Sequence, residues 1–322
     1  MSMDKSAKIY VAGHRGMVGA ALLRRLKSAG YERLLFRTHA ELDLTDQPAV
    51  FEFLTSERPD YIFLAAARVG GIHANDTYRA QFLYENLAIE SNMIHGAHLA
   101  GVERLLFLGS SCIYPRDCLQ PINEDYLLTG SLEKTNEPYA IAKIAGIKLC
   151  EAYNSQYGHR YISVMPTNLY GPCDNYDLSN SHVLPALIRK FHEARINQSP
   201  SAVVWGTGLP RREFLHVDDL ADACVFLMER DYAGPLVNIG TGIDLSIREL
   251  AQLVAVSVEY TGEIEFDTRK PDGTPRKLLD VGRMKALGWQ AGISLAEGVY
   301  RTYASYRQEW GAAIKQPIPI PA

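Results

Sequence analysis

The stretch KIYVAGHRGMVG, residues 8–19, decides the fold. Its first half is an apolar β-type run, and a helical pattern follows over Val18–Ala29. Glycines at Gly13, Gly16 and Gly19 join the two. Glycines at a strand-to-helix turn let backbone N–H groups approach a pyrophosphate, and the helix N-terminus adds partial positive charge. The stretch therefore predicts a dinucleotide-binding unit, although its G-x-x-G-x-x-G spacing differs from the common G-x-G-x-x-G.

Short β-type runs and longer helical patterns alternate through the first half of the chain. Several runs, such as IFLAA and LLFLG, are apolar without alternation, which is typical of parallel strands covered on both faces. Strands are expected at Lys8–Ala12, Arg33–Arg37, Tyr61–Ala65, Arg104–Leu108 and Tyr161–Met165. Helices are expected at Val18–Ala29, Pro48–Thr55, Ala80–Ala100 and Tyr139–Tyr157. The repetition predicts an α/β fold with a Rossmann-like, doubly wound parallel sheet.

Beyond residue 170 this rhythm loosens, and the patterns become mostly helical. We therefore expect two domains: a nucleotide-binding domain over residues 1–170, and a smaller, mostly helical substrate domain over residues 171–322. The segment PLVNIG suggests that residues near 213–240 return to the first domain. The second domain would then consist mainly of residues 171–212 and 241–322.

Composition excludes several classes of protein. The 33 Lys+Arg against 37 Asp+Glu give a net charge of -4, which argues against nucleic-acid binding. The sequence contains no apolar run long enough to span a membrane. The cysteines are few and scattered, which predicts a reduced, cytoplasmic protein. His95 and His98 share a helix face, but a metal site needs a third ligand, so no metal is expected.

The end of the second expected strand indicates the cofactor. An acidic residue there would bind the ribose hydroxyls of NAD, but this chain has Arg37. Arg15 lies inside the glycine loop, and two guanidinium groups suit a 2′-phosphate. We therefore predict NADP(H) as the cofactor. The candidate residues of the loop are Gly13, His14, Arg15, Gly16, Met17, Val18 and Gly19.

A catalytic pattern follows the fourth expected strand. Ser110 lies just after that strand, and Tyr139 and Lys143 lie four residues apart at the start of a helix. Residues at this spacing share a helix face. An ammonium beside a phenol favours the phenolate and lowers its pKa, which suits proton transfer at a carbonyl. The Ser110 hydroxyl could hold the carbonyl oxygen.

Taken together, the glycine loop, the serine pair and the Tyr–Lys pair resemble the extended short-chain dehydrogenase/reductase family. Longer runs, among them FLGSSCIYP, TNEPYAIAKIAG, MPTNLYGPCDN and KPDGTPRK, resemble its branch that epimerises and reduces GDP-4-keto-6-deoxy-D-mannose. The resemblance implies a GDP-sugar substrate, NADP(H), and conversion to GDP-L-fucose by C3 and C5 epimerisation and C4 reduction. Relatives often pair two long helices across a two-fold axis, which implies a homodimer.

The resemblance also assigns residues. Cys112 is the base and His182 the acid of epimerisation, and a thiol and an imidazole both suit proton exchange near neutral pH. It implies further cofactor contacts at Leu108, Gly109, Lys143, Pro166, Asn168, Leu169 and His182. It implies substrate contacts at Lys190, Trp205, Arg212 and Asp272.

Rival functions on the same fold remain open at this point. An NAD-dependent nucleotide-sugar 4-epimerase is the main alternative, but Arg37 and Cys112 speak against it. A nucleotide-sugar dehydratase needs an acidic pair beside the serine, where this chain has Ser111 and Cys112. A non-catalytic NADP sensor would have no use for an intact set of Ser110, Tyr139 and Lys143.

Overall fold

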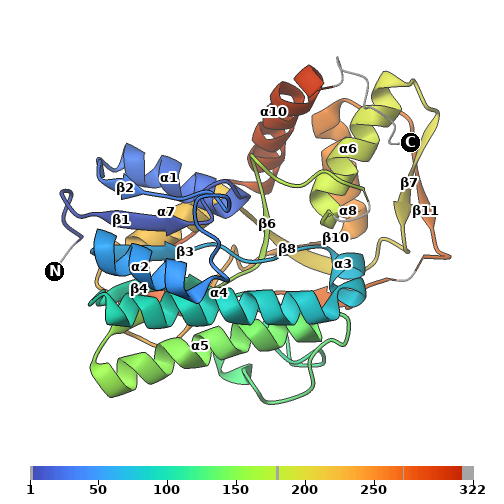
Figure 1. The fold of residues 1–322 in the computed structure, drawn as a ribbon. Coiled ribbons are helices and arrows are strands. Elements are labelled where there is room, and N and C mark those ends of the chain that lie inside the picture. Colours follow the sequence, from blue (N-terminus) through green and yellow to red (C-terminus); the bar gives the residue numbers. More distant parts are fainter. Residues whose placement is uncertain (1–2, 179–180, 271, 314–322) are drawn as a thin grey trace.

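The computed structural model describes residues 3–178, 181–270 and 272–313. Within those ranges a six-stranded parallel sheet forms the centre of the molecule (Figure 1), which confirms the expected fold class. From edge to edge its strands are β2 (Leu34–Leu35), β1 (Ile9–Ala12), β3 (Tyr61–Leu64), β4 (Arg104–Leu108), β5 (Arg160–Pro166) and β9 (Val237–Ile239). Because β2 and β3 lie on opposite sides of β1, the strand order reverses there. Open α/β sheets bind ligands beyond the carboxyl ends of the strands at such a point.

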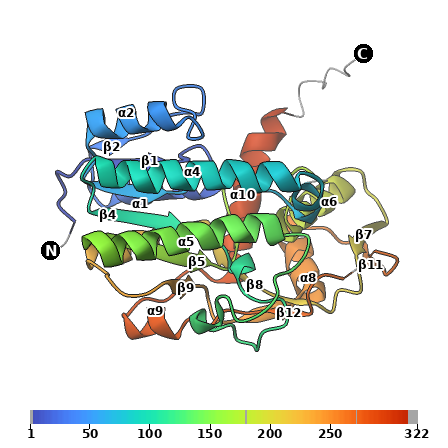
Figure 2. The ribbon, with the colours of Figure 1, turned by 60° about the horizontal axis from the view of Figure 1, so that its bottom comes forward.

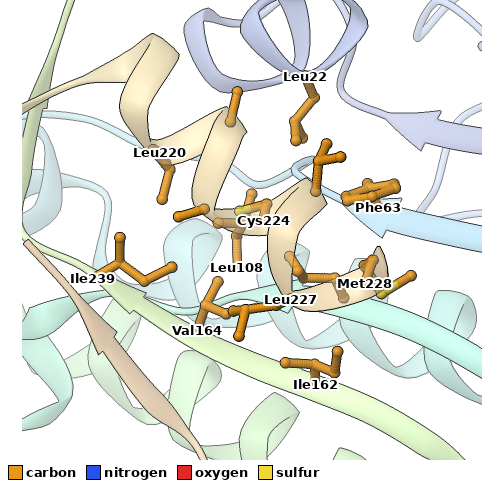
Figure 3. Close-up of a cluster of buried hydrophobic side chains, with 14 of the residues drawn as sticks. Leu22, Phe63, Leu108, Ile162, Val164, Leu220, Cys224, Leu227, Met228 and Ile239 are labelled. Carbon is orange, nitrogen blue, oxygen red and sulfur yellow. The ribbon is translucent and has the colours of Figure 1, made fainter. Parts of the chain in front are cut away.

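Helices cover both faces of this sheet. One face packs against α1 (Met17–Ser28) and α7 (Val217–Glu229). Figure 3 shows this core, in which Leu220 and Cys224 of α7 lie over the strand residues Leu108 and Val164. The other face is covered by three helices: α2 (Gln47–Glu57), α4 (Arg79–Leu99) and α5 (Glu137–Tyr157). The short helix α3 (Ile72–Thr77) precedes α4.

The observed elements follow the sequence pattern closely, with one short strand. The helices expected at Ala80–Ala100 and Tyr139–Tyr157 are α4 and α5, which lie side by side (Figures 1 and 2). The strand expected at Arg33–Arg37 is confined to β2. It lies at the sheet edge and pairs only through two residues of β1, so there is little to extend it.

A second part of the molecule is built on three helices and short strands around its own core. The helices are α6 (Val183–Ile196), α8 (Ile247–Val258) and α10 (Leu295–Ala313). One strand pair joins β7 (Ser201–Trp205) to β11 (Glu263–Asp267). A second small sheet contains β6 (Asn168–Tyr170), β8 (Arg211–His216), β10 (Asp244–Ser246) and β12 (Arg276–Lys277). None of the helices in the described ranges has the length and hydropathy that crossing a bilayer requires.

The chain passes repeatedly between the two parts. β9 returns to the central sheet, as the segment PLVNIG predicted. Beyond it, Met284 of α9 (Gly282–Ala286) and Trp289 also lie in the core under α1 and α7. Glu213 of β8 is fully buried and accepts hydrogen bonds from the backbone N–H groups of Gly242 (2.7 Å) and Leu279 (3.0 Å). This carboxylate ties β8 to the two segments that follow β9.

Candidate active site

The glycine loop has the shape that a pyrophosphate needs. Gly13 has φ +84°, and a Cβ there would lie 2.8 Å from the backbone of Ala66. A Cβ on Gly19 would collide with the carbonyl oxygen of Gly13. At Gly16, the N-cap of α1, a Cβ would meet only that carbonyl, at 3.5 Å. The loop is thus tight where it turns and open at the helix N-terminus, where an anion is stabilised by N–H groups and the helix dipole.

Two arginines lie near this loop, as the NADP prediction requires. Both Arg15 and Arg37 act on the carboxyl of Glu41, whose pKa is lowered first by hydrogen bonds from Thr38 and then by these two charges. Arg15 is exposed. The Arg37 guanidinium forms an ion pair with Glu57 at 3.0 Å, so a 2′-phosphate would have to compete with that carboxylate.

The remaining cofactor candidates surround the carboxyl ends of β1, β4 and β5. The ring of His14 packs on Phe36, with ring centroids 4.7 Å apart. Gly109 follows β4, and a Cβ there would displace the end of the Met165 side chain. The others lie in α1 or on the strands: Met17, Val18, Leu108, Pro166, Asn168 and Leu169.

Ser110, Tyr139 and Lys143 lie near the carboxyl end of β4. Ser110 is the N-cap of a short 3-10 helix (Ser111–Ile113), and its hydroxyl accepts a hydrogen bond from the Cys112 N–H at 3.4 Å. Tyr139 lies in the first turn of α5 and packs edge-on against Phe82. The ammonium of Lys143 lies 5.7 Å from the centre of the Tyr139 ring. The helix therefore places the pair as the spacing predicted.

The expectation that Lys143 lowers the pKa of Tyr139 is wrong for this structure. Burial raises the pKa of Tyr139 well above its usual range, and the charges of Cys112 and Glu90 raise it further. A residue that the sequence did not single out adds to the effect of burial. Glu90 of α4 forms an ion pair with Lys143, Nζ to Oε1 3.0 Å, and offsets its positive charge.

Cys112 and His182 come from distant parts of the chain. Cys112 lies in the 3-10 helix after β4 and is half-buried, and His182 is the N-cap of α6. Lys277 of β12, which pairs with Arg212 of β8, acts electrostatically on both. The charge of Lys277 thus influences both the thiol and the imidazole, which come from different parts of the chain.

Burial sets the protonation of this pair. It raises the pKa of Cys112, which Lys277, Ser110 and Lys143 lower again in part. Burial lowers the pKa of His182, and Lys277 lowers it further. His182 is nevertheless exposed to solvent. Enough protein atoms lie around it to lower its pKa. Both groups favour their neutral forms, with Lys277 as the main support for a thiolate.

Two of the substrate candidates flank an open hollow of about 310 Å³. Trp205 is 58% exposed, and the ammonium groups of Lys190 and Lys270 lie 4.9 and 5.1 Å from its ring. Lys190 also donates a hydrogen bond to the carbonyl of Val203 at 3.1 Å. An exposed indole with two cations near its ring can stack on an aromatic base while the cations bind phosphate.

The other two substrate candidates lie next to this group. Asp272 accepts hydrogen bonds from the N–H of Thr207 (2.9 Å) and from its hydroxyl (2.7 Å), two residues after Trp205. Burial lowers the pKa of Arg212, and the neighbouring Asp272 charge raises it. The structure therefore gathers Lys190, Trp205, Arg212 and Asp272 around the loop that follows β7.

Sequence reasoning missed Glu90 and Lys277. Glu90 lies in a helix of the expected length, but a single acidic residue within a long helix carries no local signal. Lys277 ends the run KPDGTPRK, in which Asp272 is the residue with an expected role. Pairing between distant strands places it near Cys112, and no local spacing reports that.

Comparison with known proteins gives consistent results. The sequence matches the NAD dependent epimerase/dehydratase family over residues 9–240. It is 59% identical to GDP-L-fucose synthase 1 of Arabidopsis thaliana over 303 residues, 94% of each chain. It is 58% identical to GDP-L-fucose synthase of Escherichia coli (strain K12), covering 92% of this chain and 95% of that protein. A solved GDP-L-fucose synthetase from Naegleria fowleri bound to NADP superposes with a TM-score of 0.90 at 27% identity, covering 97% and 96% of the two chains.

Proposed function

This chain belongs to the NAD dependent epimerase/dehydratase family, and from that premise we propose that it converts GDP-4-keto-6-deoxy-D-mannose to GDP-L-fucose. It is an NADPH-dependent enzyme that epimerises C3 and C5 and then reduces the C4 ketone. The relatives do not favour the alternative, an NAD-dependent nucleotide-sugar 4-epimerase.

The observation that supports this proposal is the electrostatic contact between Cys112 and the Tyr139–Lys143 pair. Tyr139 and Lys143 form the reductase pair, and Cys112 and His182 form a second one. The charge of Cys112 acts on Tyr139, and Lys143 acts on Cys112, so the pairs share a neighbourhood. A plain reductase needs only the first pair, whereas an epimerase-reductase needs both.

Epimerisation uses the second pair. The 4-keto group acidifies C3 and C5, because loss of either proton gives an enolate. The Ser110 hydroxyl donates a hydrogen bond to the ketone oxygen and stabilises the charge that develops there. The Cys112 thiolate removes the proton from carbon, and His182 returns one to the opposite face. The C–H bond breaks and re-forms with inverted configuration, and no electrons are gained or lost.

Reduction uses the first pair. Bound NADPH supplies the hydride for C4. The glycine loop and the N-terminus of α1 would hold the pyrophosphate of the cofactor, and Arg15 and Arg37 would bind its 2′-phosphate, in competition with Glu57 for Arg37. As charge develops on the C4 oxygen, Tyr139 donates its phenolic proton, and its raised pKa keeps that proton in place until then.

The substrate candidates provide the recognition of GDP. Trp205 stacks on the guanine or ribose, and Lys190 and Arg212 pair with the diphosphate. Asp272 accepts a hydrogen bond from a hydroxyl of the sugar nucleotide, in addition to its bonds from Thr207. A chain with a net charge of -4 needs such local cations to bind an anionic substrate.

The homodimer and the compartment are part of the same proposal. Large apolar side chains are exposed along α4 and α5, among them Tyr84, Leu99, Ile141 and Tyr157. Two such helices from each protomer can form a four-helix interface. We place the enzyme in the cytoplasm, where reducing conditions keep the Cys112 thiol available.

The test combines the purified enzyme, NADPH and GDP-4-keto-6-deoxy-D-mannose. Absorbance of the reduced nicotinamide should fall by one equivalent per substrate consumed, and GDP-L-fucose should form. A 4-epimerase, a dehydratase or a sensor would cause no net oxidation of NADPH.

The variant Arg37→Asp tests the choice of cofactor. The KM for NADPH should rise, and the KM for NADH should change little. An unchanged preference for NADPH over NADH would show that Arg37 does not bind the cofactor.

A further inference from the structure

Glu90 is a buried carboxylate of α4 that faces α5, the helix that carries Tyr139 and Lys143. Glu90 of α4 and Lys143 of α5 face each other with 2% and 3% of their side chains exposed, and their Nζ–Oε1 distance is 3.0 Å. Within the described residues, the Lys143 ammonium is the one charged group in contact with this carboxylate, and the angles at that contact are not those of a well-formed hydrogen bond. An ionised carboxylate in such a place is costly unless its charge is used or offset.

The space for this carboxylate is built into α5. Gly146 lies three residues after Lys143, and a Cβ there would lie 2.7 Å from Oε2 of Glu90 and 2.5 Å from the ring of Phe107. Phe107 also lies under the Lys143 ammonium, 4.7 Å from ring centre to Nζ. Glycine in the middle of a helix is destabilising relative to alanine. Here it makes room for Glu90 and Phe107.

The groups around Glu90 link it to the reduction step. The charge of Glu90 raises the pKa of Tyr139 and of Cys150. Burial raises the pKa of Glu90, and Lys143 lowers it again in part. Tyr139 also faces Cys112, whose charge acts on it more strongly than that of Glu90.

We propose that Glu90 is a positioning residue for the reduction step: it holds the Lys143 ammonium at the base of the site and offsets the positive charge that Tyr139 would otherwise face. This inference rests on the proposed function, because it concerns how Tyr139 acts as a proton donor. A lone ammonium beside Tyr139 would favour the phenolate, which cannot donate a proton. With Glu90 in place, Tyr139 stays protonated at higher pH.

The test compares the pH dependence of two reactions in Glu90→Gln. This change removes the charge and keeps the shape. The alkaline limb of NADPH oxidation should move to lower pH by about one unit, as expected for an uncompensated charge nearby. Deuterium exchange into C3 and C5, measured in heavy water without NADPH, should keep its wild-type pH profile. Glu259→Gln, which removes a carboxylate from a surface pair with Arg195, should change neither profile.

Each remaining outcome is decisive. An unmoved alkaline limb in folded Glu90→Gln would overturn the proposal. Equal losses of oxidation and exchange, with a lower Tm, would also overturn it and make Glu90 a residue of stability alone. If Glu90→Gln does not fold, Glu90→Asp, which keeps the charge, should fold and keep the wild-type limb; failure of both to fold would again mean a purely structural role. Failure of the wild-type enzyme to oxidise NADPH with this substrate would instead disprove the proposed function.

Discussion

The pair proposed for reduction and the pair proposed for proton exchange are assembled in different ways. Tyr139 and Lys143 lie one turn apart on α5, so helix geometry alone brings them together. Cys112 follows β4, His182 begins α6, and Lys277, which acts on both, comes from β12. The first pair depends on one element, and the second on the docking of both parts of the molecule. The two activities should therefore be separable by mutation.

Tyr139→Phe should have the largest effect and should fall on one activity only. Loss of a general acid costs about 10²–10⁴-fold, and we expect NADPH oxidation to fall toward the upper end of that range. Exchange of deuterium into C3 and C5 should continue, because Ser110 still holds the ketone oxygen. The two rates are measured in parallel, NADPH oxidation by absorbance and deuterium exchange by analysis of samples quenched at timed intervals. Tyr300→Phe, on an exposed part of α10, is the matched control.

Equal losses in both assays would break the comparison. They would mean that Tyr139 also polarises the ketone during enolate formation, so that the two pairs act as one. Unchanged NADPH oxidation in Tyr139→Phe would show that the Tyr139–Lys143 pair does not act in the reduction.

Cys112→Ser should give the next largest effect, on the other activity. Replacing the thiol by a hydroxyl of much higher pKa should slow deuterium exchange by about 10²-fold or more. NADPH oxidation should decline with it, because reduction uses the epimerised ketone. Cys173→Ser, at an exposed cysteine, is the control. Wild-type exchange in Cys112→Ser would identify His182 or a water molecule as the base.

Lys277→Met should give the smallest effect, a shift in pH dependence. The raised pKa of Cys112 and the lowered pKa of His182 should form the two limbs of a bell-shaped exchange profile. The positive charge of Lys277 lowers both pKa values, so its removal should raise both and move the whole bell upward by about one pH unit. Lys285→Met, at an exposed lysine of α9, should leave the bell in place. A bell that moves on one side only would show that Lys277 faces a single member of the pair.

Much of the fold was predictable because its signals are local. Apolar strands without alternation, regular helical patterns and glycines at a strand-to-helix turn predict the parallel sheet and the cofactor loop. The position of Tyr139 relative to Lys143 follows from helix periodicity. The boundaries of β2 were less predictable, because an edge strand extends only as far as its single neighbour supports it.

The electrostatics of the site were not predictable in the same way. The spacing of Tyr139 and Lys143 suggests a lowered phenol pKa, but burial raises that pKa, and Glu90, from another helix, offsets the lysine. The influence of Lys277 on Cys112 depends on the pairing of β12 with β8. Charges that meet through tertiary packing leave no pattern in a single segment, and the family resemblance indicated residue roles rather than protonation states.

The return of the chain to the central sheet has a consequence for its synthesis. Residues of α7, β9 and α9 complete the core beneath α1, so the ribosome must deliver more than two thirds of the chain before that face is covered. Until then the edge of β5 and the apolar surface around Val164 are open to other chains, a setting that favours aggregation and chaperone binding. A fragment ending at residue 212 should accordingly be degraded rapidly by protease at low concentration, whereas the full chain resists.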